Sequence, residues 1–245
     1  MGIRAFAVFV IVFSLATTEL VAQHSSSTTE GPLETSNDVL RRHHIAHTEP
    51  ALIAALQNND PEVRELAAVV LAEDGAKDAI PSIVEALRAE TVPENQASMA
   101  LSLARLGESM GRETLKNMCD DATKPDRLRM AAAVKMRYLH DDSCLPAVGL
   151  VLQSGRDAAA RTQALYLVPS FRHLPEEDFQ PLFGLVVKAL EDREHGVRMA
   201  ASSVLGQIGD VSAIPHLRNA LAKEQNDGCR LTMRLVLQQL EKKGH

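Results

Sequence analysis

Two distant stretches of the chain share one pattern. Val197 to Leu217, VRMAASSVLGQIGDVSAIPHL, matches Val63 to Ile83, VRELAAVVLAEDGAKDAIPSI, with Arg, Gly and Pro at the same places. The offset between the two stretches is 134 residues throughout, which indicates a multiple of a shorter period. Self-similarity at a fixed period is typical of repeat architectures. The chain is therefore constrained to build one small unit several times over.

The period emerges when the chain is aligned on the Arg of each VR pair. The aligned position, which we call the arginine column, holds Arg64, Gln96, Arg129, Arg161, Arg198 and Arg230. Successive members are 32, 33, 32, 37 and 32 residues apart. A second column holds Pro81, Glu113, Pro146, Pro181 and Pro215. The 37-residue step contains VPSFRHLPEEDF, Val168 to Phe179, which predicts a longer loop inside the fourth repeat.

Each repeat is predicted to hold two helices, A and then B. The A helix begins at residues such as Asp60 and Pro61, which suit a cap and a first turn. It ends at a glycine able to adopt a left-handed conformation, at Gly75, Gly107 and Gly209, and the third repeat departs from this with His140. Ala pairs inside A allow helices to approach closely, and the Pro column suits the first turn of B. A single pair leaves apolar faces uncovered, whereas stacked pairs bury them.

Composition agrees with packed helices. Hydrophobic residues make up 45% of the chain, yet it has no Trp and two Tyr, so Ala, Leu, Val, Ile and Met must build the core. The net charge of −6 gives no general attraction for phosphate backbones, which argues against nucleic acid as a partner.

The N-terminus predicts export. An unbroken apolar run, Ala5 to Leu15, follows Arg4 and has the length of a secretory signal. Cleavage after Ala22 or Ala16 would remove this run and leave no membrane span. The rival interpretation is an uncleaved anchor, but a run of about 11 apolar residues is shorter than the roughly 20 needed to cross a bilayer as a helix. We therefore predict a signal peptide at 1–22, a flexible Ser/Thr-rich leader at 23–38, a repeat domain at 39–243, and a secreted or periplasmic protein.

The repeat pattern resembles a known family. The motif D-x-x-V-R-x-x-A-A-x-x-L-x-x-x-G-x-x-x-A-I-P-x-L, best preserved at Val197 to Leu217, is similar to a HEAT repeat of the short class associated with phycobilisome lyases. The resemblance covers about residues 50–241. It implies an all-α, right-handed α-solenoid of about five to six helical hairpins, with B helices lining the concave face. The atypical ends are Glu49 to Gln57, similar to an isolated B helix after a degenerate A helix, and Cys229 to Lys243, similar to a lone A helix.

Enzymatic branches of this family make specific demands. HEAT-like deoxyhypusine hydroxylases bind iron through His-Glu dipeptides, and this sequence contains none; Glu194-His195 is reversed and alone. Bilin lyases act on cytosolic or plastid proteins, which conflicts with an export signal. An enzyme or cofactor-binding protein of this kind remains the alternative, but the sequence favours a protein that is not an enzyme and holds no cofactor.

The His residues before the repeats offer one candidate metal site. His43 and His47 are four residues apart, so a helix would place both on one face, at a spacing that can bind zinc or copper. No Cys or carboxylate is close in sequence to complete the set. An exposed polar end helix explains these residues equally, and we predict no metal site.

The arginine column has two interpretations. Five Arg residues in register could bind an anion, or they could link each repeat to acidic turns of its neighbour, for which Asp60, Asp74, Asp141, Asp142, Asp157, Glu194 and Asp210 are available. We favour the structural role, because paired guanidinium groups suit a repeated interface.

The cysteines are predicted to stay reduced. Cys119 aligns with residues near the end of a B helix, and Cys144 with residues at a B-helix start. Parallel neighbouring B helices would then separate them by roughly 12 Å of helix rise, beyond the reach of a disulfide. We therefore expect three free, largely buried thiols at Cys119, Cys144 and Cys229.

The partner surface is predicted on the B helices. Positions two and six residues after the Pro column should be core, and positions one and four after it should face the concave groove. The groove positions with candidate roles in binding a protein or peptide are Ala147, Leu150, Leu182, Leu185, Glu85, Asn117, His216 and Asn219. They form an apolar centre with polar ends, as expected of a contact site. A covering loop at 168–179, or a rotated helix, would instead make the leucines core.

These features predict an exported scaffold or accessory subunit that binds a protein or peptide. Its uniform repeats and its lack of recognisable catalytic motifs favour interaction over catalysis.

Overall fold

Helices fill the described part of the chain, which is residues 35–244 of a computed structural model, and no strand occurs among these residues. The A helices are α3 (Pro61–Glu73), α5 (Pro93–Leu106), α7 (Asp126–Tyr138), α9 (Ala158–Leu167), α11 (His195–Ile208) and α13 (Asp227–Lys243). The B helices are α2 (Glu49–Ala55), α4 (Ile80–Ala89), α6 (Ser109–Asp120), α8 (Leu145–Ser154), α10 (Glu176–Lys188) and α12 (Ile214–Lys223). Short 3₁₀ turns are η1 (Lys77–Ala79), η2 (Val168–Phe171), η3 (Ala189–Glu191) and η4 (Val211–Ala213).

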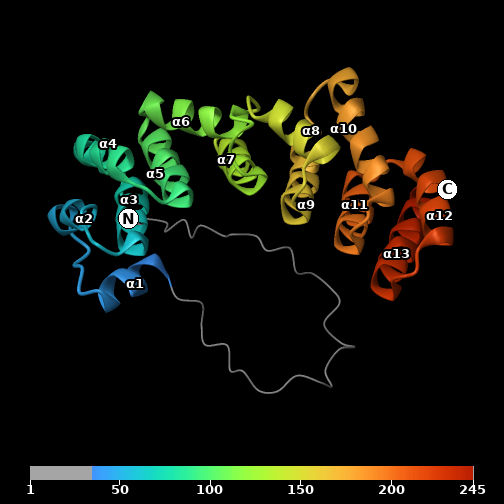
Figure 1. The fold of residues 1–245 in the computed structure, drawn as a ribbon, viewed down its shortest axis with the longest axis horizontal. Coiled ribbons are helices and arrows are strands. Elements are labelled where there is room, and N and C mark those ends of the chain that lie inside the picture. Colours follow the sequence, from blue (N-terminus) through green and yellow to red (C-terminus); the bar gives the residue numbers. More distant parts are fainter. Residues whose placement is uncertain (1–34, 245) are drawn as a thin grey trace, which may run out of the picture. The chain divides into compact units, whose positions relative to one another are not determined.

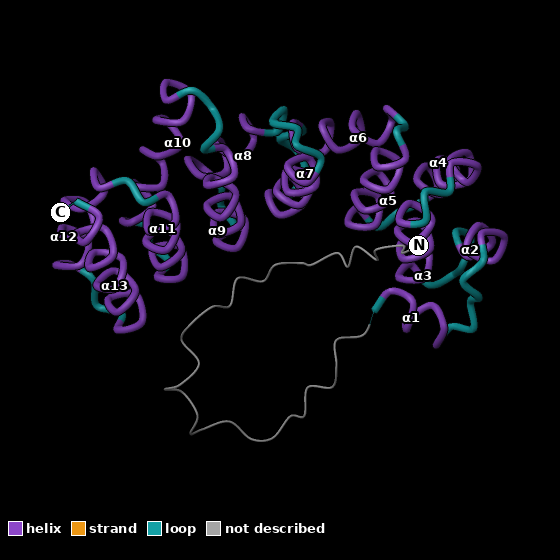
Figure 2. Tube along the Cα trace, turned by 180° about the vertical axis from the view of Figure 1, so that it is seen from behind, coloured by secondary structure: helices purple, strands orange, loops and turns teal. Residues whose placement is uncertain are grey.

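The helices form two rows. Each A helix packs against the A helices before and after it, and each B helix packs against the A helix of the next repeat. Figure 1 shows the A helices following one another in one row and the B helices in a second row, and Figure 2 shows the same two rows from behind. The all-α solenoid is therefore confirmed. Its right-handedness and the concave position of the B helices stay predictions.

Local signals place the ends of the A helices as expected. The Asp60 carboxylate accepts from the backbone N–H of Glu62, and Asp157 caps α9 in the same way. Gly75 and Gly107 have φ of 71° and 93°, and His140 has a φ of 57° in the corresponding turn of the third repeat. The left-handed ends predicted at the glycines are confirmed, and His140 adopts the same conformation although the sequence departs from glycine there. A residue with positive φ terminates the helix and lets the chain turn into B.

Small side chains bring the A helices together. Ala67, Ala132, Ala164 and Ala201, which share one repeat position, are completely buried. Alanine adds little volume at a helix crossing, so larger neighbours such as Leu71 can interlock around it. The core therefore runs continuously from repeat to repeat.

The proline column predicts the start of the B helix correctly in three repeats and wrongly in one. Pro81, Pro146 and Pro215 lie in the first turns of α4, α8 and α12, as predicted. Pro181 instead lies inside α10, which begins at Glu176. Proline at that place leaves the carbonyl of Glu177 without its helical partner, and Glu177 is exposed, so water can bind it. The longer segment before α10 thus extends the helix backwards instead of forming only a loop.

Helix α6 also departs from the repeat. It begins two residues after Gly107, whereas α4 and α12 each begin five residues after the corresponding glycine. The column residue Glu113 cannot fix a helix start as proline does. Gly111 then allows an unusually close approach to α5, because a Cβ there would lie 2.5 Å from Ala104 N and closer still to Ala100 O.

The prediction of three free thiols is wrong for two of them. Cys119 and Cys144 form a disulfide, with Cα atoms 5.9 Å apart. The prediction assumed that neighbouring B helices share one register, but the early start of α6 brings its last turn beside the residue that precedes α8. Cys229 is free and buried, as predicted.

The first described helix, α1 (Ser36–Arg42), corrects two further expectations. It includes residues 36–38, which were predicted as leader. It ends before His43, and His44 adopts a φ of 60°, so His43 and His47 do not share a helix face. The predicted signal peptide and residues 23–34 of the predicted leader lie outside the described residues.

Candidate functional site: two rows and their edge

The predicted B-row patch is not formed as expected. Ala147 and Leu182 are 2% and 5% exposed and belong to the core, so they cannot contact a partner. Leu150 is exposed and Leu185 is half-buried, so only part of the apolar centre reaches the surface. Ala147 and Leu182 occupy the same repeat position, one residue after the proline column, and this position faces the core in both α8 and α10.

The polar ends of the predicted patch are exposed. They are Glu85, Asn117, His216 and Asn219. The core positions predicted two residues after the proline, Ile83, Val148 and Leu217, are completely buried. Of those predicted six residues after it, Leu87 is buried, whereas Leu152 and Leu221 are only partly buried. The B row is therefore mostly polar on its exposed side, with Leu150 as its single strongly exposed large apolar side chain in the described chain.

Exposed apolar side chains gather instead on the A helices. Eight large apolar side chains are exposed among residues 35–244, and six of them lie on α7, α9, α11 and α13. We call these six the A-row surface: Val134, Tyr138, Tyr166, Met199, Leu231 and Leu235. Because the A helices pack side by side, residues at the same repeat position lie on one face of the row.

The A-row surface has a repeat signature that sequence reasoning missed. Val134, Tyr166 and Leu235 each follow the arginine column by five residues, and Val69 and Leu101 occupy the same position in earlier repeats. Both tyrosines of the chain are in the surface, and Tyr138 and Tyr166 are 52% and 51% exposed. This apolar column on the A helices, which is separate from the buried Ala pairs, is the sequence signal that could have indicated the A-row surface.

The arginine column forms bidentate ion pairs in its most regular repeats. Arg64 donates from Nε and Nη2 to the two carboxylate oxygens of Glu90, both at 2.9 Å. Arg198 binds Glu224 in the same way, at 2.6 and 2.8 Å. Each carboxylate also accepts from two backbone N–H groups of the turn that follows it, such as those of Thr91 and Val92. The pair therefore joins an A helix to the turn that leaves its own repeat.

A second set of bonds joins one repeat to the next. Arg198 Nη1 donates to the carbonyl oxygen of Asp192 at 2.8 Å, and the carboxylate of Asp192 accepts two bonds of 2.8 Å from Arg161. Asp192 thus belongs to two successive repeats. We call the whole series of bonds the arginine ladder. The structural interpretation of the column is confirmed, although the bidentate partners Glu90, Asp192 and Glu224 were not among the acids predicted.

The ladder carboxylates are strongly stabilised in the charged form. The hydrogen bond from Arg64 lowers the pKa of Glu90 to about 2, even though burial opposes this. Arg198 likewise holds the pKa of Glu224 far below its ordinary value. Burial and the neighbouring Glu224 carboxylate raise the pKa of the Cys229 thiol to about 12, so this cysteine is an unreactive core residue.

The middle of the ladder lacks these pairs. Gln96 donates to the carbonyl oxygen of Glu90 at 2.6 Å and carries no charge. Arg129 donates to the carbonyl oxygen of Cys119 at 2.9 Å, and Gly155 stands where the other repeats have a carboxylate. An added Cβ at Gly155 would lie 2.6 Å from Val151 O, so a side chain there would require the backbone to shift.

Two adjoining hollows lie along the edge where B helices turn into the next A helices. The first, the ladder groove, has a volume of about 540 Å³ and is lined by Leu152, Gln153, Ser154, Gly155, Arg156, Arg161, Leu185, Lys188, Ala189, Glu191, Asp192, Arg193 and Val197. The second, of about 790 Å³, shares Glu191, Asp192 and Arg193 with the first and is also lined by Lys223 and Glu224. Both have bonds of the arginine ladder in their walls.

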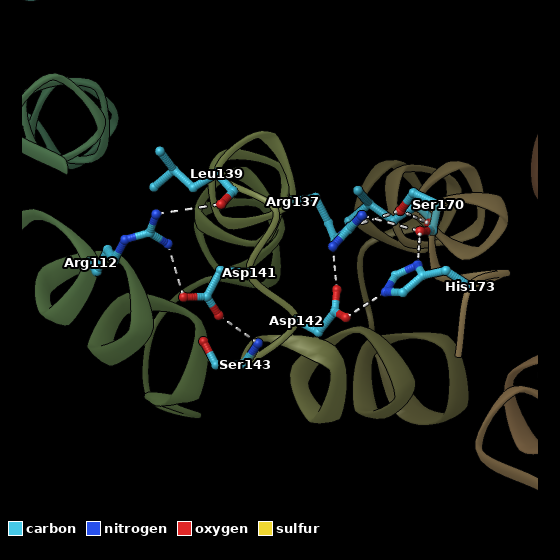
Figure 3. A network of polar contacts seen from close by, with 9 residues as sticks. Arg112, Arg137, Leu139, Asp141, Asp142, Ser143, Ser170 and His173 are labelled. Carbon is cyan, nitrogen blue, oxygen red and sulfur yellow. Dashed lines mark hydrogen bonds and ion pairs between the residues drawn. The ribbon is translucent and has the colours of Figure 1, made fainter. Parts of the chain in front are cut away.

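The long segment of repeat four is anchored rather than laid over the B row. Phe171 and Phe179 are buried in the core. Figure 3 shows His173 and Ser170 turned toward Arg137 and Asp142 of the preceding repeat, with His173 Nε2 2.7 Å from Asp142 Oδ2 and Arg137 Nη2 donating to Ser170 O at 3.2 Å. The segment therefore fastens repeat four to the turn of repeat three.

The His residues near α1 do not form the pair expected for a metal. His47 Nε2 lies 2.7 Å from Asp74, whereas His43 lies beside Asp60 and Glu62, with ligand atoms within 4.8 Å of one another. Carboxylates are thus closer to His43 than the sequence indicated. Asp60 already serves as the cap of α3, so we assign this cluster a structural role.

None of the helices in residues 35–244 combines the length and the apolar character that a bilayer crossing requires.

Comparisons with known proteins bear on the repeats. The family of HEAT repeats matches residues 49–137 and 145–238. A search of curated proteins finds no match. Among solved structures, the chain is similar to an engineered protein from the Northeast Structural Genomics Consortium, with 17% identity, a TM-score of 0.47, and coverage of 86% of this chain and 61% of that one. A second engineered protein from the consortium has 18% identity, a TM-score of 0.34, and coverage of 86% and 85%. The chain thus spans less than two thirds of the first engineered protein.

Proposed function

We propose that this chain, which belongs to the HEAT-repeat family, is an exported, non-catalytic scaffold or accessory subunit that binds a partner protein through its A-row surface. Stacked helical repeats present extended surfaces, and such surfaces serve protein binding. The proposal moves the partner from the B row, where Ala147 and Leu182 are buried, to the A row.

The observation that carries the proposal is the group of exposed apolar side chains on the A helices, three of which, Val134, Tyr166 and Leu235, share one repeat position. Tyr138 and Tyr166 are each about half exposed. They are the two tyrosines of a chain that has no tryptophan, so its largest aromatic side chains lie at the surface and not in the core. Tyrosine supplies a large contact area together with a polar hydroxyl, and it is enriched at the centres of interfaces. Met199 and Leu235 extend the same surface along α11 and α13.

Two features support export. The apolar run at Ala5 to Leu15 has the length and flanks of a secretory signal. The Cys119–Cys144 disulfide fits an oxidising compartment, because thiols stay reduced in the cytosol. Mass spectrometry of the mature protein from its native organism tests this directly. Cleavage after Ala22 or Ala16 and delivery outside the cytosol are expected, whereas an intact Met1 on a cytosolic protein would refute export.

The partner experiment compares the two rows. A tagged chain is isolated with its bound proteins from the native organism in three forms: the wild type, Tyr138→Asp with Tyr166→Asp, and Leu150→Asp. The last variant is the matched control, since Leu150 on the B row is 51% exposed and close in exposure to the two tyrosines. We expect a stoichiometric partner with the wild type and the control but not with the tyrosine variant. Binding of the purified partner is then measured by calorimetry.

The outcome separates the rows clearly. Loss of the partner with Leu150→Asp and its retention with the tyrosine variant would overturn the A-row assignment. Thermal unfolding of each variant shows whether it is folded, and all three substituted side chains are exposed, so little destabilisation is expected. One stoichiometric partner would identify an accessory subunit, whereas several would identify a general scaffold.

A further inference from the structure

The ladder groove carries cations that the protein itself does not neutralise. Its two lining carboxylates are already engaged, Asp192 with Arg161 at 2.8 Å and Glu191 with Lys223 at 3.6 Å. The side chains of Arg156 and Lys188 have no ion pair or hydrogen bond within residues 35–244, and both are exposed. Arg193 forms an ion pair with its chain neighbour Glu194 at 3.6 Å, and its charge also acts on the Asp192 carboxylate.

This concentration of positive charge is local. The whole chain has a net charge of −6, so most of its surface would repel an anionic ligand. The lining of the ladder groove, by contrast, holds four cationic side chains and two carboxylates, so its charge is positive. Charge complementarity of this kind selects partners and speeds their association.

Part of the lining of the groove is apolar. It includes Leu152 and Leu185, which are half-buried, and Val197, which is buried. A hollow of about 540 Å³ has the size of a small ligand site and can hold a few side chains of a peptide. No aromatic side chain lines the groove, so it offers nothing on which a nucleic-acid base could stack.

We propose that the ladder groove binds an acidic peptide segment in which an aliphatic residue is flanked by carboxylates. The aliphatic side chain rests on Leu152 and Leu185, and the carboxylates pair with Arg156, Lys188 and Arg193. The inference goes beyond the scaffold function of the A row, because it rests on a separate surface and on charge instead of exposed apolar area.

The test uses the full chain and a fluorescent ten-residue peptide with one leucine between glutamates. Fluorescence anisotropy measures its Kd, and the same peptide with glutamine for glutamate, or with glycine for leucine, measures the two parts of the recognition. We expect both changes to weaken binding at least fivefold. We also expect binding of the acidic peptide to weaken as salt is raised, since the cations are exposed.

A charge-reversal variant locates the site. Arg156→Glu, Lys188→Glu and Arg193→Glu together should weaken binding of the acidic peptide at least tenfold. The matched control reverses three exposed cations elsewhere, with Lys77→Glu, Arg88→Glu and Lys242→Glu, and should change the Kd less than twofold. Should the first variant fail to fold, the corresponding glutamine substitutions at Arg156, Lys188 and Arg193 are measured in its place.

Three results would overturn the proposal. The first is that the acidic peptide does not bind, and the second is that the control variant weakens its binding as much as the charge-reversal variant does. The third is that the glycine peptide binds as tightly as the leucine peptide and is displaced by inorganic phosphate, which would indicate a general anion-binding hollow. None of these results bears on the A-row surface, since that surface is tested with the tyrosine variant and a different partner.

Discussion

The outer and middle repeats join their neighbours by different chemistry. In the outer repeats, Arg64 with Glu90 and Arg198 with Glu224 form bidentate pairs that close the turn between repeats. In the middle, Gln96 and Arg129 bind only carbonyl groups or a weakly aligned Asp126, and a disulfide and a close helix contact are present instead. The repeats therefore all stack on their neighbours, but the interaction that stabilises each junction differs from one repeat to the next.

The largest expected effect concerns an outer junction. Arg198→Ala leaves the buried carboxylate of Glu224 without its partner, and we expect a loss of about 3–5 kcal/mol in the free energy of unfolding, as for other broken buried pairs. Urea unfolding at pH 7 measures it. Arg218→Ala is the control, because Arg218 pairs with Glu241 at the exposed surface and should cost less than about 1 kcal/mol. Equal costs would show that the ladder pairs are not special.

The next effect concerns the middle. Replacing Cys119 and Cys144 together by alanine should cost about 3 kcal/mol, because the disulfide closes a loop across 25 residues and restricts the unfolded chain. Unfolding is compared with and without a reducing agent. The wild type should lose stability on reduction, and the double variant should not respond. Peptide mapping that finds free thiols at both positions in the native protein would show that no disulfide stabilises the middle repeats.

Acid should weaken the outer junctions. The folded pKa of Glu90 is about 2, below its ordinary value of 4.5, so its stabilising effect is complete above pH 4.5 and is lost as the pH falls toward 2. Between pH 7 and pH 3 this residue alone should account for about 2 kcal/mol. Glu90→Gln should remove that part of the pH dependence, whereas Glu85→Gln, at an exposed position, should leave it unchanged. An identical acid response in both variants would contradict the assignment.

The smallest effect tests the close contact in the middle. Gly111→Ala forces a Cβ against the backbone of α5, and we expect a net loss of about 1–2 kcal/mol after the gain in helix propensity. Gly149→Ala on α8 is the matched control, since nothing lies within 4 Å of its added Cβ. That variant should gain up to about 1 kcal/mol. Thermal unfolding of both variants decides, and a stable Gly111→Ala protein would show that α6 can move away from α5.

Local rules predicted much of the fold because the features involved act within a few residues. The caps at Asp60 and Asp157, the left-handed glycines that end the A helices and the first-turn prolines of α4, α8 and α12 were all recognisable from the sequence. The same rules failed where a column residue changed. Glu113 left the start of α6 undefined, and the segment before Pro181 formed a turn of helix that the proline column did not indicate.

The candidate surfaces were harder to predict for a related reason. Ala147 and Leu182 share one repeat position and both face the core, so an apolar column alone does not show which face is exposed. The A-row surface also contains an apolar column, but the sequence does not show that this column is exposed while the B-helix column is buried. The ladder groove combines residues from α8, α10 and the following turns, and no spacing in the sequence links Arg156 to Lys188.

By itself the sequence determined the number and kind of helices, their pairing into repeats and the structural use of the arginine column. It could do so because caps, turns and periodic burial depend on neighbours a few residues away. Tertiary structure alone decided the Cys119–Cys144 disulfide, the acids that pair with Arg64, Arg161 and Arg198, and the row that exposes apolar side chains. These depend on the rotation and register of one helix against another, where a shift of a single residue changes which side chains meet.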